Sequence, residues 1–163
     1  MDPLLDEKII VLFSQIIPEY FYENYNLLFK REAFGPSLNE GISYEFSSYV
    51  DFSGDIAGRL FLCMDGATKL KILPYLSKFH HVDTYQKGMA NSILMEIINQ
   101  IASLFSEEFS YAKINIKIYP PEINNHVLYR VDFDKFRQYV LIFNVYADSH
   151  LIGRVYFIIL LEK

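Results

Sequence analysis

Residues 91–103, "NSILMEIINQIAS", indicate how the chain is organised, because their pattern separates a buried face from an exposed one. At 100° per residue, apolar residues cover one side of a helix and polar residues fall on the other side at i, i+4, i+7 and i+11. The apolar face comprises Ile93, Leu94, Ile97, Ile98, Ile101, Leu104 and Phe105, and the polar stripe comprises Ser92, Glu96, Asn99 and Ser103. We predict a long helix over residues 85–109 that packs on a sheet and presents the polar stripe outward.

The polar stripe has two interpretations. It is an ordinary solvated helix face, since every amphipathic helix has one, or it is a surface that contacts another molecule. Two features favour contact. Asn99 lies in the helix interior, where Asn is a poor helix former. The polar stripe also lacks the i,i+4 pairs of opposite charge that usually decorate an exposed helix. An unpaired Glu96 beside Asn99 is suited to bind a cation and a water that another molecule supplies.

The N-terminal part of the chain predicts a helix followed by irregular structure. Asp2 and Pro3 resemble an N-cap and first-turn pair, and apolar residues then recur at helical spacing up to Ile17. Pro18 is expected to kink or end this helix. The aromatic-rich residues 19–34 show no clear period, so we expect them to pack on the core or to cover a sheet edge.

The remainder predicts an α+β fold with a largely antiparallel sheet and helices packed on it. We expect strands over residues 42–52, 56–64, 111–119, 138–147 and 151–161, and a short helix over residues 65–78. Gly58 inside a strand indicates a close backbone approach or a bulge. The sequence "ADSH" at residues 147–150 predicts a hairpin turn. The last strand is apolar on both faces, which predicts burial on both sides or pairing with another chain.

Composition excludes several classes of function. About half of the 163 residues are apolar, which suits a single domain, residues 1–163, with a sizeable core. The formal net charge of −5, without clustered Lys and Arg, argues against nucleic acid. The longest apolar runs fall far short of the ~20 residues that span a membrane, and the acidic N-terminus does not resemble a secretory signal. A lone Cys63 cannot form an internal disulfide, so we expect a cytoplasmic protein.

Metal and nucleophilic chemistry are not supported by the spacing of the residues that such chemistry needs. The histidines at positions 80, 81, 126 and 150 are not joined to Asp, Glu or Cys at ligand spacing, so we expect no metal site and no cofactor of the chain's own. Cys63 lies in a predicted strand and has no His partner at catalytic spacing. We expect it to be a buried, inert thiol.

The polar stripe resembles the signature of the CheC/CheX/FliY group of chemotaxis phosphatases. In that group a Ser or Asp precedes a Glu by four residues, an Asn follows the Glu by three, and a proline lies some twenty residues downstream. Here Ser92, Glu96 and Asn99 match, with Pro120 and Pro121 in "YPPEI". The resemblance also includes "FSGDIAGRLFLCMDGATKLKIL" and the last pair of strands, and covers roughly residues 45–161. The single copy of the signature resembles the CheX branch.

The resemblance implies an enzyme that dephosphorylates the aspartyl phosphate of a CheY-type response regulator. Asn99 would orient the attacking water, and Glu96 would pair with a lysine of the regulator, whose receiver domain holds Mg²⁺. Ser92 would have a supporting or docking role, and Ser103 would contact the partner. The resemblance also implies a homodimer.

Two positions depart from the family pattern, because Ile98 and Ser103 replace residues that are usually small, often Gly. Ile98 is either part of the core or an obstacle to the partner. Two alternatives therefore stay open: a non-catalytic receiver-binding module of the same fold, and a dimeric structural partner of the flagellar switch.

Overall fold

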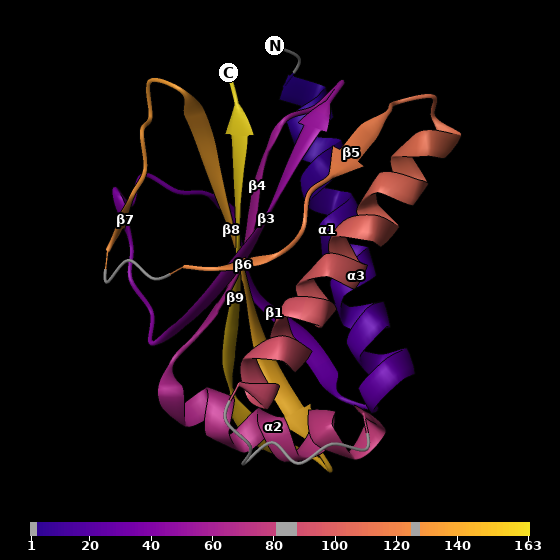
Figure 1. The fold of residues 1–163 in the computed structure, drawn as a ribbon, viewed down its shortest axis with the longest axis vertical. Coiled ribbons are helices and arrows are strands. Elements are labelled where there is room, and N and C mark those ends of the chain that lie inside the picture. The colour runs from indigo at the N-terminus through magenta and orange to yellow at the C-terminus, as the bar shows by residue number, and fades with distance from the viewer. Residues whose placement is uncertain (1–2, 81–87, 125–127) are drawn as a thin grey trace.

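The computed structural model describes residues 3–80, 88–124 and 128–163, which form three helices packed on one face of an antiparallel sheet (Figure 1). This confirms the predicted α+β class. The helices are α1 (Pro3–Tyr25), α2 (Gly66–His80) and α3 (Met89–Tyr111). The strands are β1 (Leu28–Pro36), β2 (Gly41–Ile42), β3 (Phe46–Gly54), β4 (Gly58–Met64), β5 (Ile116–Ile118), β6 (Glu122–Ile123), β7 (Tyr129–Arg130), β8 (Phe136–Ala147) and β9 (His150–Glu162).

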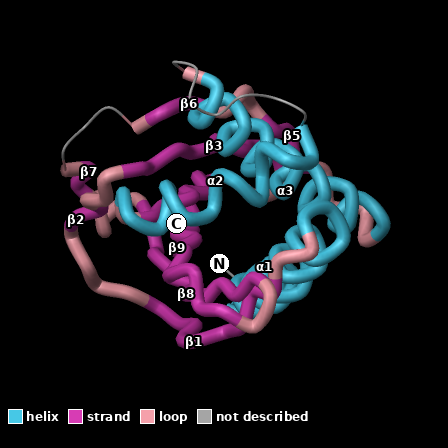
Figure 2. The backbone as a smooth tube through the Cα atoms, turned by 90° about the horizontal axis from the view of Figure 1, so that it is seen from below, coloured by secondary structure: helices cyan, strands magenta, loops and turns pink. Residues whose placement is uncertain are grey.

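The main sheet has the strand order β1-β8-β9-β4-β3-β5, and β6 also pairs with β3. Helices α1 and α3 lie side by side across one face, and α2 crosses one end of the sheet (Figures 1 and 2). The large core fills the space between this face and the helices. Six of the seven residues predicted for the apolar face of α3 belong to that core, whereas Leu104 is exposed and lines a groove beside α1.

The opposite face of the sheet carries a second, smaller core that the short β2–β7 sheet covers. It comprises Ile42, Phe61, Cys63, Val131, Ile158 and Leu160. Cys63 is fully buried, and burial raises the pKa of its thiol to about 12, as expected for an inert cysteine. Strand β9 runs between β8 and β4 and contributes to both cores. Its two apolar faces are therefore explained by burial within the sheet, without pairing with another chain.

Helix α1 does not end at Pro18, contrary to one expectation, but continues to Tyr25. An internal proline costs a helix about 3 kcal/mol. Here the next two turns bury the rings of Tyr20, Phe21 and Tyr25, and each buried ring contributes roughly 1.5 to 3 kcal/mol. Burial thus outweighs the missing backbone bond. The helix stops at Asn26, which takes a left-handed conformation with φ 55°.

The prediction of irregular structure for residues 19–34 was wrong beyond α1 as well, because β1 begins at Leu28. This strand pairs with β8 and forms one edge of the sheet. Most of its residues are exposed, including the charged Lys30, Arg31 and Glu32, and a register shift occurs between Arg31 and Ala33. An exposed, irregular edge strand has little of the period-2 pattern that identifies a strand in a sequence.

The hairpin predicted at residues 147–150 is present, and β3 and β4 form a second antiparallel hairpin. Gly58 opens β4 where a Cβ atom would lie 2.0 Å from the Leu160 carbonyl oxygen, so the expected close backbone approach is confirmed. Asp148 and Ser149 both have positive φ, as a two-residue turn between β8 and β9 requires. Strand β5 begins only at Ile116, because α3 continues to Tyr111 and is followed by a turn in which Lys113 has a φ of 61°.

The predicted N-terminal ends of α1 and α3 lie outside the described residues. Asp2, the expected N-cap of α1, and residues 85–87, the expected start of α3, are not described. Pro74 lies inside α2, which extends to His80. No helix in the described ranges has both the length and the apolar character needed to cross a membrane.

A buried carboxylate anchors α1 to the sheet. Asp6 is 4% exposed and accepts hydrogen bonds of 2.5 and 2.9 Å from the Arg137 guanidinium and of 2.5 Å from the Tyr139 hydroxyl. Burial opposes ionisation of Asp6, but these bonds and the charge of Arg137 outweigh it and lower its pKa. The ionised carboxylate therefore contributes to stability.

We expect Asp6→Asn to lower the free energy of unfolding by about 2 kcal/mol at neutral pH, since hydrogen bonds to charged groups are worth roughly 1.5 to 3 kcal/mol. A carboxyl with a lowered folded-state pKa stabilises the fold above its unfolded pKa, ~3.9, and loses this effect as the pH falls through the folded value. The difference from wild type should therefore shrink below about pH 4 in urea unfolding. Glu7→Gln, at an exposed neighbour, is the control. A difference that stays constant with pH would contradict this account.

Candidate functional site

The polar stripe lies on α3, on the side that faces away from the sheet. Ser92, Glu96 and Ser103 are exposed and Asn99 is partly exposed. The residues between them, Ile97 and Ile98, are fully buried in the core. The helix is therefore fixed in rotation, and the predicted arrangement of these four residues on one outward face is what the structure shows.

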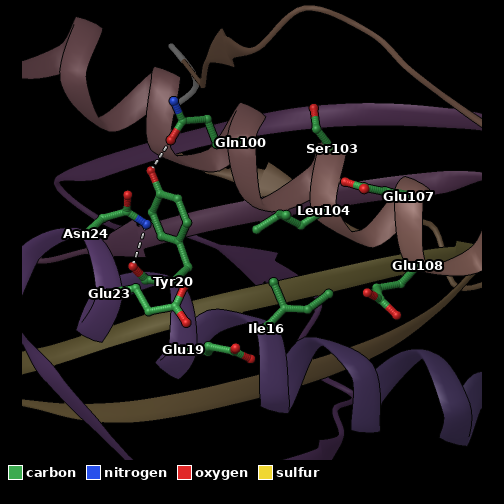
Figure 3. A pocket seen from close by; sticks show the side chains of 10 residues that line it. All are labelled: Ile16, Glu19, Tyr20, Glu23, Asn24, Gln100, Ser103, Leu104, Glu107 and Glu108. Atoms are coloured by element: carbon green, nitrogen blue, oxygen red, sulfur yellow. Dashed lines mark hydrogen bonds between the residues drawn. The ribbon is translucent and has the colours of Figure 1, made fainter.

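Glu96 has a neighbour on its own helix that sequence reasoning missed. The Gln100 side-chain nitrogen donates a hydrogen bond of 3.2 Å to one carboxylate oxygen of Glu96. The Gln100 side-chain oxygen in turn accepts a hydrogen bond from the Tyr20 hydroxyl of α1 (Figure 3). The i,i+4 spacing of Glu96 and Gln100 was a visible signal for the first contact. The second joins residues 80 positions apart, for which the sequence gives no signal.

Tyr20 and Tyr25 place buried hydroxyl groups near Glu96. Burial raises the pKa of Tyr20 well above its ordinary value, and Tyr25 and the charge of Glu96 raise it further. Burial also raises the pKa of Tyr25, and the charge of Glu96 adds to this. Both phenols are therefore protonated throughout the neutral range.

Asn99 differs from Glu96 in its surroundings. Its side-chain amide makes no hydrogen bond to any residue in the described part of the chain, whereas its backbone oxygen accepts one from Ser103. An amide offers both a donor and an acceptor without a net charge. Asn99 therefore presents unused hydrogen-bonding groups beside the carboxylate of Glu96.

The two serines of the polar stripe bond to their own helix. The Ser92 hydroxyl donates to the Gly88 carbonyl and the Ser103 hydroxyl to the Asn99 carbonyl, both at 2.9 Å. Such bonds to the preceding turn are common for Ser within helices. Both serines are exposed, and each hydroxyl oxygen can still accept a hydrogen bond.

The two departures from the family pattern have different consequences. Ile98 is fully buried, so it belongs to the core and cannot obstruct a partner. Ser103 is exposed. Pro120 and Pro121 lie between β5 and β6, and α3 contacts both of these strands. The downstream prolines thus belong to the segment that flanks α3 on the side opposite α1 (Figure 2).

An open groove of about 500 Å³ runs between α1 and α3 and ends at the polar stripe. Its floor is apolar, with Ile16 and Leu104, and Tyr20, Gln100 and Ser103 lie along it (Figure 3). The remaining lining side chains are Glu19, Glu23 and Asn24 from α1 and Glu107 and Glu108 from α3. The surface beside the polar stripe is therefore acidic.

Metal ligands do not gather around this site. No group of three or more His, Cys, Asp or Glu side chains suited to a metal ion occurs among the described residues. His81 and His126 lie outside the described residues. What the polar stripe offers is a carboxylate, an amide and two hydroxyls, which can hold a cation and a water in fixed positions.

Comparison with known proteins identifies relatives of the same fold. The family model described as "Chemotaxis phosphatase CheX" matches residues 46–144. No curated protein sequence matches the chain significantly. Solved structures match over nearly the whole length.

A crystal structure of the chemotaxis protein CheX from Desulfovibrio desulfuricans has a TM-score of 0.75 and 12% identity, covering 95% of this chain and 99% of that one. A CheC-like superfamily protein from Shewanella sp. PV-4 has a TM-score of 0.76 and 13% identity, covering 100% of both chains. The CheX–CheY–BeF3–Mg²⁺ complex from Borrelia burgdorferi has a TM-score of 0.63 and 18% identity, covering 95% of this chain and 98% of that one. These likenesses establish the shared fold.

The neighbours Ile98 and Asn99 should respond in opposite ways to substitution by alanine. We expect Ile98→Ala to lower the free energy of unfolding by about 3 kcal/mol, since it leaves a cavity in the core. Asn99→Ala should leave it unchanged or raise it by up to about 0.5 kcal/mol, because Ala is the better helix former. Urea unfolding of the two variants measures both effects. A loss of more than about 1 kcal/mol for Asn99→Ala would mean that Asn99 serves the fold.

Proposed function

Since this chain belongs to the chemotaxis phosphatase CheX family, we propose that it hydrolyses the aspartyl phosphate of a CheY-type response regulator. The observation that carries the proposal is the placement of Glu96 and Asn99 on one outward face of a helix whose rotation the core fixes. The complex of a structurally similar CheX with CheY supports the choice of partner.

We assign to Asn99 the role of positioning the attacking water. In the reaction, the water oxygen forms a bond to phosphorus while the bond between phosphorus and the aspartyl oxygen breaks. The products are inorganic phosphate and a free Asp carboxylate. Phosphoryl transfer has a loose transition state, so positioning of the water supplies much of the catalysis. The Asn99 amide can accept a hydrogen bond from the water and donate one to a phosphoryl oxygen, and it adds no charge to an anionic centre.

We assign to Glu96 the role of forming an ion pair with a lysine of the regulator. Its second carboxylate oxygen accepts no hydrogen bond from the described residues and is exposed to solvent. An ion pair at this position would fix the two proteins in register one helical turn from Asn99. Ser92 and Ser103, at the two ends of the polar stripe, would contact the regulator on either side of this pair.

The metal chemistry in this proposal belongs to the partner. Mg²⁺ is part of the Borrelia burgdorferi complex, and the described residues of this chain offer no cluster of carboxylates that would hold the ion. Mg²⁺ in the regulator would offset the charge of the phosphoryl oxygens. The chain itself would then supply only the water position and the lysine clamp.

Homodimerisation and a cytoplasmic location complete the proposal. A phosphorylated response regulator is a cytoplasmic substrate. The interior position of β9 means that a sheet extended across a dimer would have to use an edge strand, and β1 forms one edge of the described sheet.

The acidic surface between α1 and α3 favours a partner that presents lysine beside its phosphorylation site.

The test is loss of phosphate from the phosphorylated regulator, with wild type, Glu96→Ala and Asn99→Ala at matched concentrations. We expect wild type to accelerate hydrolysis by about a hundredfold, which needs the activation free energy to fall by only ~2.7 kcal/mol. Each variant should hydrolyse the aspartyl phosphate at least about tenfold more slowly than wild type. Asn99→Ala should keep its affinity for the regulator, whereas Glu96→Ala should bind more weakly.

Matched controls are Glu40→Ala and Asn39→Ala, which remove an exposed carboxylate and an exposed amide from the segment between β1 and β2. Both should act like wild type. Binding without acceleration by wild type would replace the proposal with the alternative, a non-catalytic receiver-binding module.

A further inference from the structure

We propose that Tyr20 and Gln100 are positioning residues for Glu96, so that α1 takes part in a site whose other residues all lie on α3. This inference rests on the proposed function, because it concerns the residue assigned to the regulator's lysine. The observation behind it is a chain of two hydrogen bonds, from the Tyr20 hydroxyl to the Gln100 oxygen and from the Gln100 nitrogen to Glu96.

The chemistry of the three groups fixes the direction of both bonds. An ionised carboxylate only accepts hydrogen bonds, so the nitrogen of the Gln100 amide must point at Glu96. The amide oxygen then points the other way and needs a donor. The Tyr20 hydroxyl is that donor, and it stays protonated because burial raises its pKa. No other arrangement of the Gln100 amide satisfies both neighbours.

Tyr20 is a rigid end point for this chain. Its side chain is 6% exposed, and its ring makes edge contacts with the rings of Phe21 and Tyr25 at centroid distances of 5.5 and 6.1 Å. Gln100, by contrast, is exposed and has no comparable packing of its own. The buried phenol therefore holds the amide (Figure 3), and the amide holds the carboxylate of Glu96.

The continuation of α1 beyond Pro18 makes this contact possible. Tyr20 lies in the turn after the proline, and a helix that stopped at Pro18 would leave no hydroxyl beside Gln100. The last turns of α1 thus have a use beyond filling the core. They place a donor within reach of the middle of the polar stripe.

Orienting the Glu96 carboxylate before the regulator binds should increase the affinity for the regulator more than it increases the rate of the chemical step. An exposed Glu side chain loses rotamer freedom when it forms an ion pair, and a carboxylate that is already oriented loses less. Gln100 occupies one carboxylate oxygen and leaves the other for a cation. Since Asn99 positions the water, the loss of this orientation should raise KM and leave kcat nearly unchanged.

The experiment is a double-mutant cycle on the full chain with the phosphorylated regulator. We expect Tyr20→Phe and Gln100→Met, which keep side-chain volume but remove the bonds, each to raise KM and Kd by about three- to tenfold with kcat within about twofold. In the Glu96→Ala background neither should cause a further change. Tyr22→Phe, which removes a hydroxyl from an exposed tyrosine on α1, is the matched control.

Each outcome decides the matter. Wild-type KM and Kd in Tyr20→Phe and Gln100→Met would overturn the inference, and so would effects that persist in full without Glu96. Thermal unfolding of each variant separates lost orientation from lost fold, and Gln100→Met, at an exposed site, serves if Tyr20→Phe unfolds. If wild type binds the regulator without accelerating hydrolysis, the proposed function is wrong. The inference is then tested by the Kd values of the double-mutant cycle alone. If wild type does not bind at all, both are wrong.

Discussion

The apolar face of α3 against the sheet is the constraint on which the rest of the structure depends. Six residues of this helix are at most 1% exposed, so it has a single permitted rotation: Leu94, Ile97, Ile98, Ile101, Ala102 and Phe105. Interiors packed at this density do not tolerate a helix that turns to expose such residues. The outward direction of Glu96 and Asn99 therefore follows from the burial of their neighbours.

The parts of the fold that the sequence predicts correctly are those with a local signal. The 3.6-residue period identifies α3, Gly58 marks a close approach because it has no Cβ atom, and Asp148 and Ser149 occupy a tight turn. The end of α1 and strand β1 lack such a signal. Pro18 is tolerated only because rings that follow it reach a core built by distant strands. The residues of β1 alternate poorly, since one side of the strand has no sheet partner in the described structure.

The same division applies to the candidate site. Periodicity alone places Ser92, Glu96, Asn99 and Ser103 on one face, because all four belong to one helix. Ile98 was ambiguous in the sequence, since it lies at the margin of the apolar face, and only packing shows that it is core. The contribution of Tyr20 depends on how α1 lies against α3, and no local pattern encodes the distance between two helices separated by four strands and a further helix.

The central place of β9 has a consequence for how the molecule is made. This strand joins β8 on one side to β4 on the other, yet it follows every other strand in chain order. A nascent chain that has already released α3 from the ribosome still lacks the middle of the sheet on which that helix rests. Sheets closed by such long-range pairing form slowly and leave apolar surface exposed while they wait. The two halves of the sheet can therefore join only after synthesis of β9, and until then the edges of β4 and β8 that β9 occupies stay unpaired.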